Sequence, residues 1–275
     1  MTAKHLADTA RLHNGVEMPW FGLGVWRAED GPEVENMVRW AVECGYRSID
    51  TAAMYRNETS VGRAVRDCGV PREEIFLTTK VWNDDHGYDA TLRAFDESLK
   101  RLDLDQVDLY LIHWPVRERY VDTWRALEAI YASGCARAIG TSNFKEHHLE
   151  TLRAQCEIVP MVNQMEFHPR LQVPELRRYC REQGIQFEAW RPLMLGEVMK
   201  IPELRTLGEK HEKTPAQITL RWMLQRGVVT IPKSSRRERI VENADIFDFA
   251  LTAQDLAVID GLNCGGRLGA DPDEF

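Results

Sequence analysis

Features that mark several large classes of protein are missing from this sequence. Its six cysteines include no Cys-x-x-Cys pair, which argues against a zinc cage or a disulfide framework. No segment reaches the ~18 uninterrupted apolar residues of a membrane span, and the amino terminus, MTAKHLADTA, lacks the apolar core of a signal peptide. The net charge of −8 has the wrong sign for a general nucleic-acid binder. We therefore expect a cytoplasmic, metal-free protein that binds neither membrane nor nucleic acid.

A further absence concerns cofactors. The Gly-x-Gly-x-x-Gly fingerprint of Rossmann dinucleotide sites is missing, because the GLG at residues 22–24 continues into VWR without reaching a third glycine. A nicotinamide cofactor would have to bind this chain through some other arrangement. No exposed apolar stripe stands out either, which favours a monomer.

What the sequence does have is an alternation of short apolar segments with longer amphipathic ones, repeated about eight times. This pattern is typical of βα units and of a parallel sheet. The expected strands are Phe21–Gly24, Arg47–Asp50, Ile75–Lys80, Val107–His113, Ala136–Thr141, Met161–Met165, Gln186–Trp190 and Val228–Ile231. Their number predicts an α/β fold closed into a (β/α)8, or TIM, barrel, although alternation alone also fits an open sheet.

The expected helices lie between these strands. They are Glu33–Cys44, Glu58–Cys68, Tyr88–Leu102, Asp122–Ser133, Lys145–Ala154, Pro174–Gln183, Pro215–Gln225 and Arg236–Ala244. Two extra helices, Pro202–His211 and Ala253–Leu262, fall outside the alternation and are predicted to be insertions. Ahead of the first strand, Asn14-Gly15 predicts a two-residue hairpin turn, and the hairpin should plug the amino-terminal end of the barrel. The tail, Asn263–Phe275, lacks periodicity and is expected to cross the surface as a loop.

Four ionisable residues lie at or just after the ends of predicted strands. Asp50, Lys80 and His113 each end an apolar run, and Tyr55 follows the first of these runs. The carboxyl ends of barrel strands meet at one face, so side chains far apart in the sequence come together there. Taken singly, each residue also has an ordinary structural explanation, such as a turn cap or a buried histidine. Together they predict an active site.

The chemistry of these side chains suits the delivery of a proton to a carbonyl oxygen. Tyrosine has an ordinary pKa of ~10. A Lys80 charge ~4 Å away is worth ~4 kcal/mol at an effective dielectric of ~20, which would bring the pKa of Tyr55 near ~7. Asp50 would keep the lysine charged, and a neutral His113 would donate a hydrogen bond to the carbonyl oxygen. A second possibility is that Lys80 is a Schiff-base nucleophile, as in class I aldolases.

Carbonyl reduction also needs a hydride, which only a cofactor supplies. The best candidate for a cofactor-binding segment is IPKSSRRER at residues 231–239, which leaves the last strand and enters a helix. Phosphate sites after the last strands recur in this fold, and Lys233, Ser234 and Arg239 suit an additional phosphate. A solvated, charged helix start is the alternative explanation of the same segment.

A series of motifs in a fixed order resembles the aldo-keto reductase family across essentially the whole chain. The motifs are GYRSIDTAAMY at residues 45–55, TKVW at 79–82, LIHWP at 111–115, GTSNF at 140–144, NQ at 163–164 and IPKS at 231–234. The resemblance implies one aldo-keto-reductase-type barrel domain over residues 1–275 with NADPH as its cofactor. It also implies that Tyr55 is the general acid and that His113 orients the carbonyl. Lys80 and Asp50 would tune the tyrosine.

The same resemblance implies a set of cofactor-binding residues: Ser142, Asn143, Gln164, Trp190, Arg191, Leu193, Lys233, Ser234, Arg239, Glu242 and Asn243. The first three match positions that hold the nicotinamide carboxamide, and Trp190 matches the aromatic that stacks on the ring. The last five residues of this set match positions that bind the adenosine and its 2′-phosphate. Arg191 stands where the family commonly has serine, and such a cation either pairs with the pyrophosphate or obstructs its loop.

Within the family, the chain is most similar to small bacterial reductases acting on 2,5-diketo-D-gluconate and on glyoxal or methylglyoxal. Segments such as HNGVEMPWFGLGVW and ENADIFDF carry this likeness. We therefore expect NADPH-dependent reduction of aldehydes, small ketones and α-dicarbonyls, with a keto-sugar reductase as the alternative. An alternative of another class is a non-catalytic NADPH-binding or structural barrel. The expected substrate pocket is lined by Trp26, Met54, Trp82, His113 and Trp114.

Overall fold

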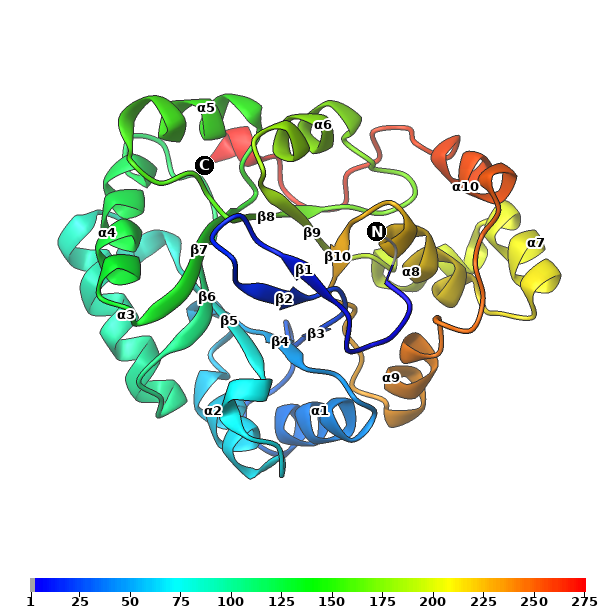
Figure 1. Cartoon of the computed structure of the whole chain (residues 1–275), viewed down its shortest axis with the longest axis horizontal. Helices are drawn as coiled ribbons and strands as arrows, with labels where there is room; N and C mark the ends of the chain where they lie inside the picture. Colours follow the sequence, from blue (N-terminus) through cyan, green and yellow to red (C-terminus); the bar gives the residue numbers. More distant parts are fainter. Residues whose placement is uncertain (1–2) are drawn as a thin grey trace.

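A ring of eight parallel strands forms the centre of the computed structural model, which describes residues 3–275 (Figure 1). The strands are β3 (Leu23–Gly24), β4 (Ser48–Asp50), β5 (Phe76–Val81), β6 (Val107–Ile112), β7 (Ala136–Ser142), β8 (Val162–Glu166), β9 (Gln186–Trp190) and β10 (Val229–Thr230). Each pairs with its neighbour in the sequence, and the two ends of the sheet meet through a parallel bridge between Phe21 and Thr230. The predicted barrel is therefore confirmed, and the alternative of an open sheet is wrong.

The barrel strands are largely buried on both faces, because helices cover the outside and packed side chains fill the inside. Every residue of β5 and β6 is buried. Parallel strands buried in this way appear in the sequence as nearly continuous hydrophobic runs. Lys80, a fully buried lysine, is an exception near the carboxyl end of β5. Such a residue needs a specific partner, because an unpaired buried charge is strongly unfavourable.

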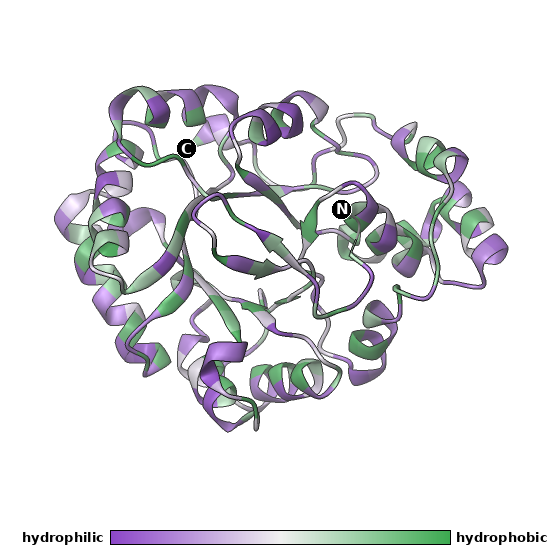
Figure 2. Cartoon of the chain, viewed as in Figure 1, coloured by the Kyte–Doolittle hydropathy of each residue, from purple (hydrophilic) through white to green (hydrophobic). Residues whose placement is uncertain are grey.

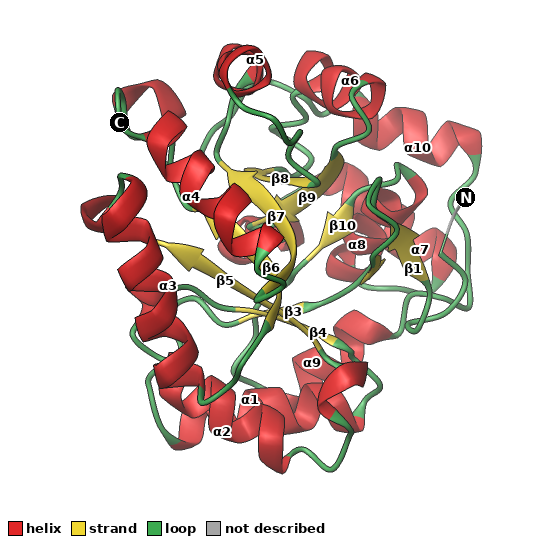
Figure 3. Cartoon of the chain, turned by 60° about the vertical axis from the view of Figure 1, so that its left-hand side comes forward, coloured by secondary structure: helices red, strands yellow, loops and turns green. Residues whose placement is uncertain are grey.

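The helices surround this ring (Figure 3). They are α1 (Pro32–Glu43), α2 (Glu58–Asp67), α3 (Tyr88–Leu102), α4 (Tyr120–Ala132), α5 (Glu146–Gln155), α6 (Pro174–Glu182), α8 (Pro215–Gln225) and α9 (Arg237–Ala244). Several of them carry hydrophobic and hydrophilic residues in alternation, as Figure 2 shows, which suits helices packed on one side against a barrel. Within residues 3–275, none combines the length and apolar character that crossing a bilayer requires.

An antiparallel hairpin lies across the amino-terminal opening of the barrel (Figure 1). Its strands are β1 (Thr9–Arg11) and β2 (Glu17–Pro19). The turn differs from the predicted two-residue form, because the Leu12 amide donates a hydrogen bond to the Val16 carbonyl at 2.9 Å and leaves three residues between them. Gly15 has φ of 89°, the left-handed conformation that a three-residue loop places at its last position.

Both predicted insertions are helices, α7 (Pro202–His211) and α10 (Ala253–Asp260), and they lie beside each other at one side of the barrel (Figure 1). Asp255 joins them. Its carboxylate accepts from Lys210 Nζ at 2.6 Å and lies 2.9 Å from His211 Nε2. A short 3₁₀ segment, Met194–Lys200, connects β9 to α7 and contributes to the cavity described below.

We expect Gly62→Ala to lower the free energy of unfolding by about 2 kcal/mol. Gly62 lies inside α2, and a Cβ at this position would overlap the backbone carbonyl of Leu102 at the end of α3. The two helices would have to separate, because a backbone group has no alternative rotamer. Urea unfolding followed by circular dichroism measures the change. Thr59→Ala, at an exposed position of α2, is the matched control, and equal stability of the two variants would contradict the close packing.

Candidate active site

The four predicted active-site residues meet at the carboxyl-terminal face of the barrel. Asp50 ends β4, and Lys80 reaches it from β5, with Nζ 2.6 Å from Asp50 Oδ1. The same Nζ lies 2.9 Å from the Thr51 carbonyl oxygen and 3.5 Å from the Tyr55 hydroxyl. His113 follows β6, and its ring centroid lies 5.7 Å from that of Tyr55. The structure thus brings together a phenol, an ammonium group and an imidazole from three neighbouring strands.

Tyr55 is a weaker acid than the sequence argument predicted. Burial of the hydroxyl raises its pKa to about 12, and the Lys80 charge opposes this only in part, because Asp50 and Glu188 act in the opposite direction. The expected pKa near 7 is therefore wrong, because the cost of burying a phenolate outweighs the stabilisation that the lysine charge provides. Tyr55 holds its proton at neutral pH, which is the form that a proton donor must have.

The environments of Lys80 and His113 hold one of them charged and the other neutral. Burial lowers the pKa of Lys80, but Asp50 and Tyr55 raise it further than burial lowers it, so the ammonium form persists. Burial, with the nearby Lys80 charge, holds the pKa of His113 well below its usual range. A neutral histidine has one ring N–H to donate to a carbonyl oxygen.

A long cavity of about 930 Å³ runs from these residues toward α9. The predicted cofactor-binding residues all line it: Ser142, Asn143, Gln164, Trp190, Arg191, Leu193, Lys233, Ser234, Arg239, Glu242 and Asn243. Trp26, Met54, His113 and Trp114 of the predicted substrate pocket line it as well. Trp82 is not among the lining residues, but its ring centroid lies 5.2 Å from that of His113. Residues from both halves of the sequence therefore share one continuous space.

Near the ionisable cluster, hydrogen bonds hold the polar side chains of the cavity in place. Asn143, which follows β7 with φ of 67°, donates from Nδ2 to the His113 carbonyl at 2.9 Å. Trp190 Nε1 donates to Asn143 Oδ1, also at 2.9 Å. This chain links the ends of β6, β7 and β9 and fixes the indole of Trp190 beside the cavity.

At the far end, the cavity is lined by the segment between β10 and α9. Ser234 Oγ accepts a hydrogen bond from the Arg236 amide at 3.1 Å, just before α9 begins at Arg237. Lys233 and Arg239 are exposed, and no salt bridge occupies either of them within the described residues. Glu242, in contrast, already has a hydrogen-bond partner, because its Oε1 accepts from Thr214 Oγ1 at 2.7 Å. Arg236 lines this end as well, so three cations are offered to an anionic group.

Arg191 occupies the middle of the cavity wall. Its guanidinium carbon lies 4.9 Å from the ring centroid of Trp26 and 5.1 Å from that of Trp190, both distances typical of cation–π contact. Its backbone has φ of 54°, and its buried Nε has no hydrogen-bond partner among residues 3–275. The side chain is thus held between two aromatic rings with a donor still available.

The carboxyl-terminal tail contributes to the cavity, which the sequence did not indicate. Gly269 and Ala270 line the cavity, and Phe275 stacks on Trp114 with ring centroids 4.2 Å apart. Glu166 anchors the tail by accepting hydrogen bonds from the amides of Leu268 and Gly269, at 2.7 and 3.0 Å. The prediction of a surface loop missed this role because the tail has no periodic pattern. Arg27, which also lines the cavity, was missed as well.

His147, His148 and Asp273 form a cluster whose ligand atoms are close enough to hold a metal ion. Hydrogen bonds explain the cluster without one. Nδ1 of His148 accepts from the Lys145 amide at 3.1 Å, which places the proton of a neutral ring on Nε2, 3.7 Å from Asp273 Oδ1. A protonated Nε2 points a hydrogen at the carboxylate and has no lone pair for a metal.

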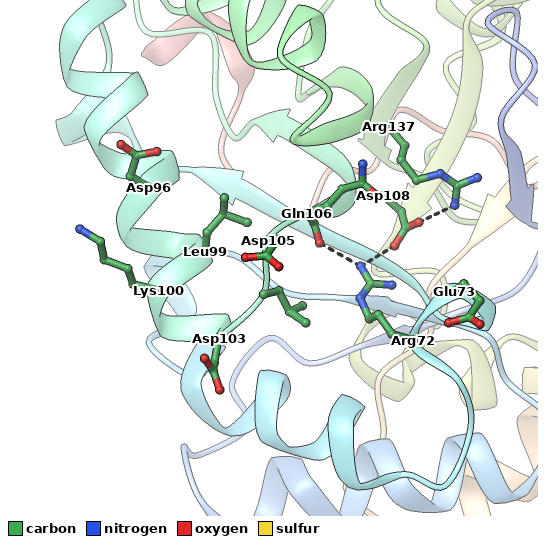
Figure 4. A pocket seen from close by; sticks show the side chains of 11 residues that line it. Arg72, Glu73, Asp96, Leu99, Lys100, Asp103, Asp105, Gln106, Asp108 and Arg137 are labelled. Carbon is green, nitrogen blue, oxygen red and sulfur yellow. Dashed lines mark hydrogen bonds and ion pairs between the residues drawn. The ribbon is translucent and has the colours of Figure 1, made fainter.

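A second cavity, of about 890 Å³, lies at the opposite end of β5–β7 (Figure 4). Asp108 is its central residue, buried between Arg72 at 2.8 Å and Arg137 at 2.7 Å. Asp108 also accepts from the Leu77 amide at 2.9 Å. Because these ion pairs and the hydrogen bond tie together the starts of three strands, this end of the barrel serves stability.

An acid, a neutral hydrogen-bond donor and a long cavity at the carboxyl-terminal face of a (β/α)8 barrel define a barrel enzyme. Residues 21–263 match the model of the Aldo/keto reductase family. The chain belongs to this family, and the resemblance seen in its motifs is confirmed.

Individual relatives cover nearly the whole chain. Glyoxal reductase of Bacillus subtilis (strain 168) is 60% identical over 270 residues, or 98% of this chain and 98% of that protein. Methylglyoxal reductase DkgA of Escherichia coli (strain K12) is 45% identical over 269 residues, or 96% and 97%. A crystal structure of a Gox0644 mutant in complex with NADPH matches with a TM-score of 0.91 at 45% identity, covering 96% of this chain and 97% of that one.

Proposed function

We propose that this protein reduces aldehydes and small ketones, including glyoxal and methylglyoxal, to alcohols with NADPH. The observation that carries the proposal is the Tyr55 hydroxyl, which lies 3.5 Å from Lys80 Nζ at one end of a cavity whose other end holds Lys233 and Arg239. One end is built to give a proton, and the other to take an anionic group. The relatives named for glyoxal and methylglyoxal reduction support the choice of substrate.

The residues of the cavity fit NADPH. Lys233 and Arg239 suit its 2′-phosphate, Trp190 presents an indole to the nicotinamide ring, and Arg191 places a cation on the cavity wall for the pyrophosphate. Ser142, Asn143 and Gln164 line the wall next to Trp190 and would hold the carboxamide. When bound, NADPH supplies the hydride.

The protein's own residues supply the remaining chemistry. His113, neutral and fixed through its carbonyl by Asn143, donates a hydrogen bond that orients the carbonyl oxygen of the substrate. Tyr55 gives its proton to that oxygen as negative charge develops there. Lys80 stabilises the phenolate that forms, and Asp50 keeps Lys80 charged and directed. Trp26, Met54 and Trp114 supply apolar walls that favour small substrates, and Trp82 packs against the His113 ring.

The Schiff-base role of Lys80 is disfavoured by the environment of its amine. Lys80 is fully buried, and its Nζ has hydrogen-bond partners in Asp50, Thr51 and Tyr55. Its raised pKa keeps the amine protonated, whereas a nucleophilic lysine must lose its proton. Borohydride treatment with methylglyoxal should therefore trap no adduct on Lys80, and mass spectrometry of the peptide that contains it decides the point.

A steady-state panel tests the proposed reaction. NADPH oxidation, followed by its absorbance, would be measured with glyoxal, methylglyoxal, simple aldehydes and 2,5-diketo-D-gluconate. We expect the highest kcat/KM with the small dicarbonyls. Preference for the keto-sugar would favour the alternative substrate class. Absence of turnover across the panel, together with measurable NADPH binding, would favour a non-catalytic barrel.

Replacing Lys233 with methionine should raise the KM for NADPH about tenfold and leave the KM for NADH unchanged. A charge-assisted hydrogen bond to phosphate is worth ~1.5–3 kcal/mol, and only NADPH carries the 2′-phosphate. Lys100→Met, at the opposite end of the barrel, is the matched control. Parallel increases in both KM values would show that Lys233 contacts a part shared by the two cofactors.

The monomeric state and the cytoplasmic location belong to the same proposal. The acidic composition, with a net charge of −8, and the lack of paired cysteines support a protein of a reducing compartment. Sedimentation velocity should give a single species near 31.7 kDa.

A further inference from the structure

Glu188 is a buried acid that the mechanism above does not use. It lies in the middle of β9 and is 1% exposed. Its register partners are Gln164 on β8 and Val229 on β10, neither of which carries a charge. Among residues 3–275, no lysine or arginine lies within ion-pair distance of its carboxyl group. A carboxyl group in such a place needs either a proton or a specific hydrogen-bond donor.

Gln164 is that donor, and it serves two acids at once. Its Nε2 lies 2.8 Å from Glu188 Oε2 and 2.8 Å from Asp50 Oδ2. An amide nitrogen has two hydrogens, and here one is donated to each carboxyl group. The reverse orientation of the amide would place Gln164 Oε1 against the Asp50 carboxylate, two acceptors with no hydrogen between them. The two acids therefore fix which end of the amide faces the cavity.

The charge state of Glu188 agrees with its surroundings. Burial raises its pKa to about 8, and Asp50 adds to the effect, while Gln164 and Lys80 oppose it. Asp50 from β4 and Lys80 from β5 are the ionisable groups that act on it most strongly. Glu188 thus carries a proton at neutral pH, which explains why it lies beside a carboxylate without a counter-ion.

We propose that Glu188 is a positioning residue for the reductase site: with Asp50 it holds both hydrogens of the Gln164 amide, so that Gln164 Oε1 faces the cavity as an acceptor. The group that it would accept from is the carboxamide N–H of the nicotinamide, so this inference rests on the proposed function. Ionisation of Glu188 at alkaline pH would add a second negative charge beside Asp50. That charge makes the Tyr55 phenolate harder to form and slows proton donation.

Two substitutions separate the positioning effect from the charge effect. Glu188→Leu removes the acceptor and leaves a buried N–H of Gln164 unpaired, so the Kd for NADPH, measured by quenching of tryptophan fluorescence, should rise about tenfold. Glu188→Gln keeps an acceptor oxygen but never ionises. Its kcat/KM for methylglyoxal should stay within about twofold of that of the unmodified enzyme at pH 7. Above pH 8, where we expect the unmodified enzyme to lose additional activity as Glu188 ionises, the variant should not show this loss.

A spectroscopic measurement tests the protonated acid directly. Infrared difference spectra at pH 7 should show a protonated carboxyl band in the unmodified protein that is absent in Glu188→Gln. The control variant Glu209→Gln, which changes an exposed glutamate of α7, should keep the band. The band does not depend on turnover. It therefore remains a test of Glu188 even if the unmodified protein fails to oxidise NADPH, an outcome that would refute the proposed function instead.

The inference is overturned if the enzyme turns over and Glu188→Leu binds NADPH with unchanged Kd. It is also overturned if Glu188→Gln keeps the alkaline loss of activity and the same carboxyl band. Should Glu188→Leu fail to fold, Glu188→Gln alone decides through the pH profile and the band.

Discussion

Tyr55→Phe is expected to lower kcat for methylglyoxal reduction by about 10³-fold while the Kd for NADPH changes less than twofold. The substitution removes the proton donor, and a positioned general acid contributes about 10²–10⁴ in rate. The phenylalanine ring retains the shape of the residue, and Tyr55 is not among the side chains assigned to the cofactor. Stopped-flow kinetics measures the rate, and fluorescence quenching measures the binding.

The matched control for this experiment is Tyr88→Phe, because Tyr88 is 44% exposed at the start of α3. It should behave as the unmodified enzyme does. Full activity in Tyr55→Phe would refute the assignment of the proton donor. A large loss of NADPH binding would instead show that the tyrosine holds the cofactor.

The second large effect is expected from Asp50→Asn, which should lower the free energy of unfolding by about 3–5 kcal/mol and nearly abolish turnover. Removing one partner of a buried ion pair leaves the other charge uncompensated, and Lys80 lies 2.6 Å from Asp50 in a fully buried position. Without Asp50, burial would lower the pKa of Lys80, so the ammonium that stabilises the phenolate would be lost. Urea unfolding at pH 7 measures the first effect, with the exposed Asp67→Asn as control.

The stabilisation that the Asp50–Lys80 ion pair provides should decrease at alkaline pH. Burial lowers the pKa of Lys80, but the neighbouring Asp50 carboxylate and Tyr55 raise it by more, so the folded pKa lies above the ordinary value of ~10.4. The stabilisation is therefore complete below that value and is lost as the pH rises through the folded pKa. On the alkaline side, the difference in stability between Asp50→Asn and the unmodified protein should begin to shrink only above pH ~10. A difference that vanished at neutral pH would contradict the ion pair.

Combining Asp50→Leu with Lys80→Met separates stability from catalysis. Apolar replacement of a whole buried pair is often neutral for stability, so the double variant should recover part of what Asp50→Asn loses. The Gln164 N–H that Asp50 accepts would remain unpaired. Activity should stay absent, because no ammonium remains near Tyr55. Recovery of activity would show that the pair serves only the fold.

Residues whose position follows from strand ends were predictable from the sequence. Asp50, Lys80 and His113 end apolar runs, and parallel strands in a barrel bring such ends together, so their meeting required no knowledge of packing. The pKa of Tyr55 was not predictable, because it depends on how completely the cavity wall surrounds the hydroxyl. Glu188 was missed because an acid inside an apolar strand has no local signal that distinguishes it from a surface residue.

The contact between the tail and the cavity illustrates a second limit. Phe275 stacks on Trp114, and Glu166 helps to hold the tail there by accepting hydrogen bonds from the Leu268 and Gly269 amides. Glu166 is 102 positions from Leu268 and 103 from Gly269 in the sequence. Short-range periodicity carries no information about such a contact, whereas it did predict α7 and α10 as insertions.

The bridge that closes the barrel has a consequence for how the protein is made. Phe21 pairs with Thr230, and the Gly24 amide donates to the Pro232 carbonyl, so the first strand completes its pairing with a segment about 200 residues later. A nascent chain on the ribosome carries an open strand edge until that segment emerges, and open edges invite association with other chains. Lys233 and Ser234 emerge with the closing segment. The capacity to bind NADPH should therefore arise at the same moment as closure, which makes cofactor binding a reporter of completed folding during synthesis.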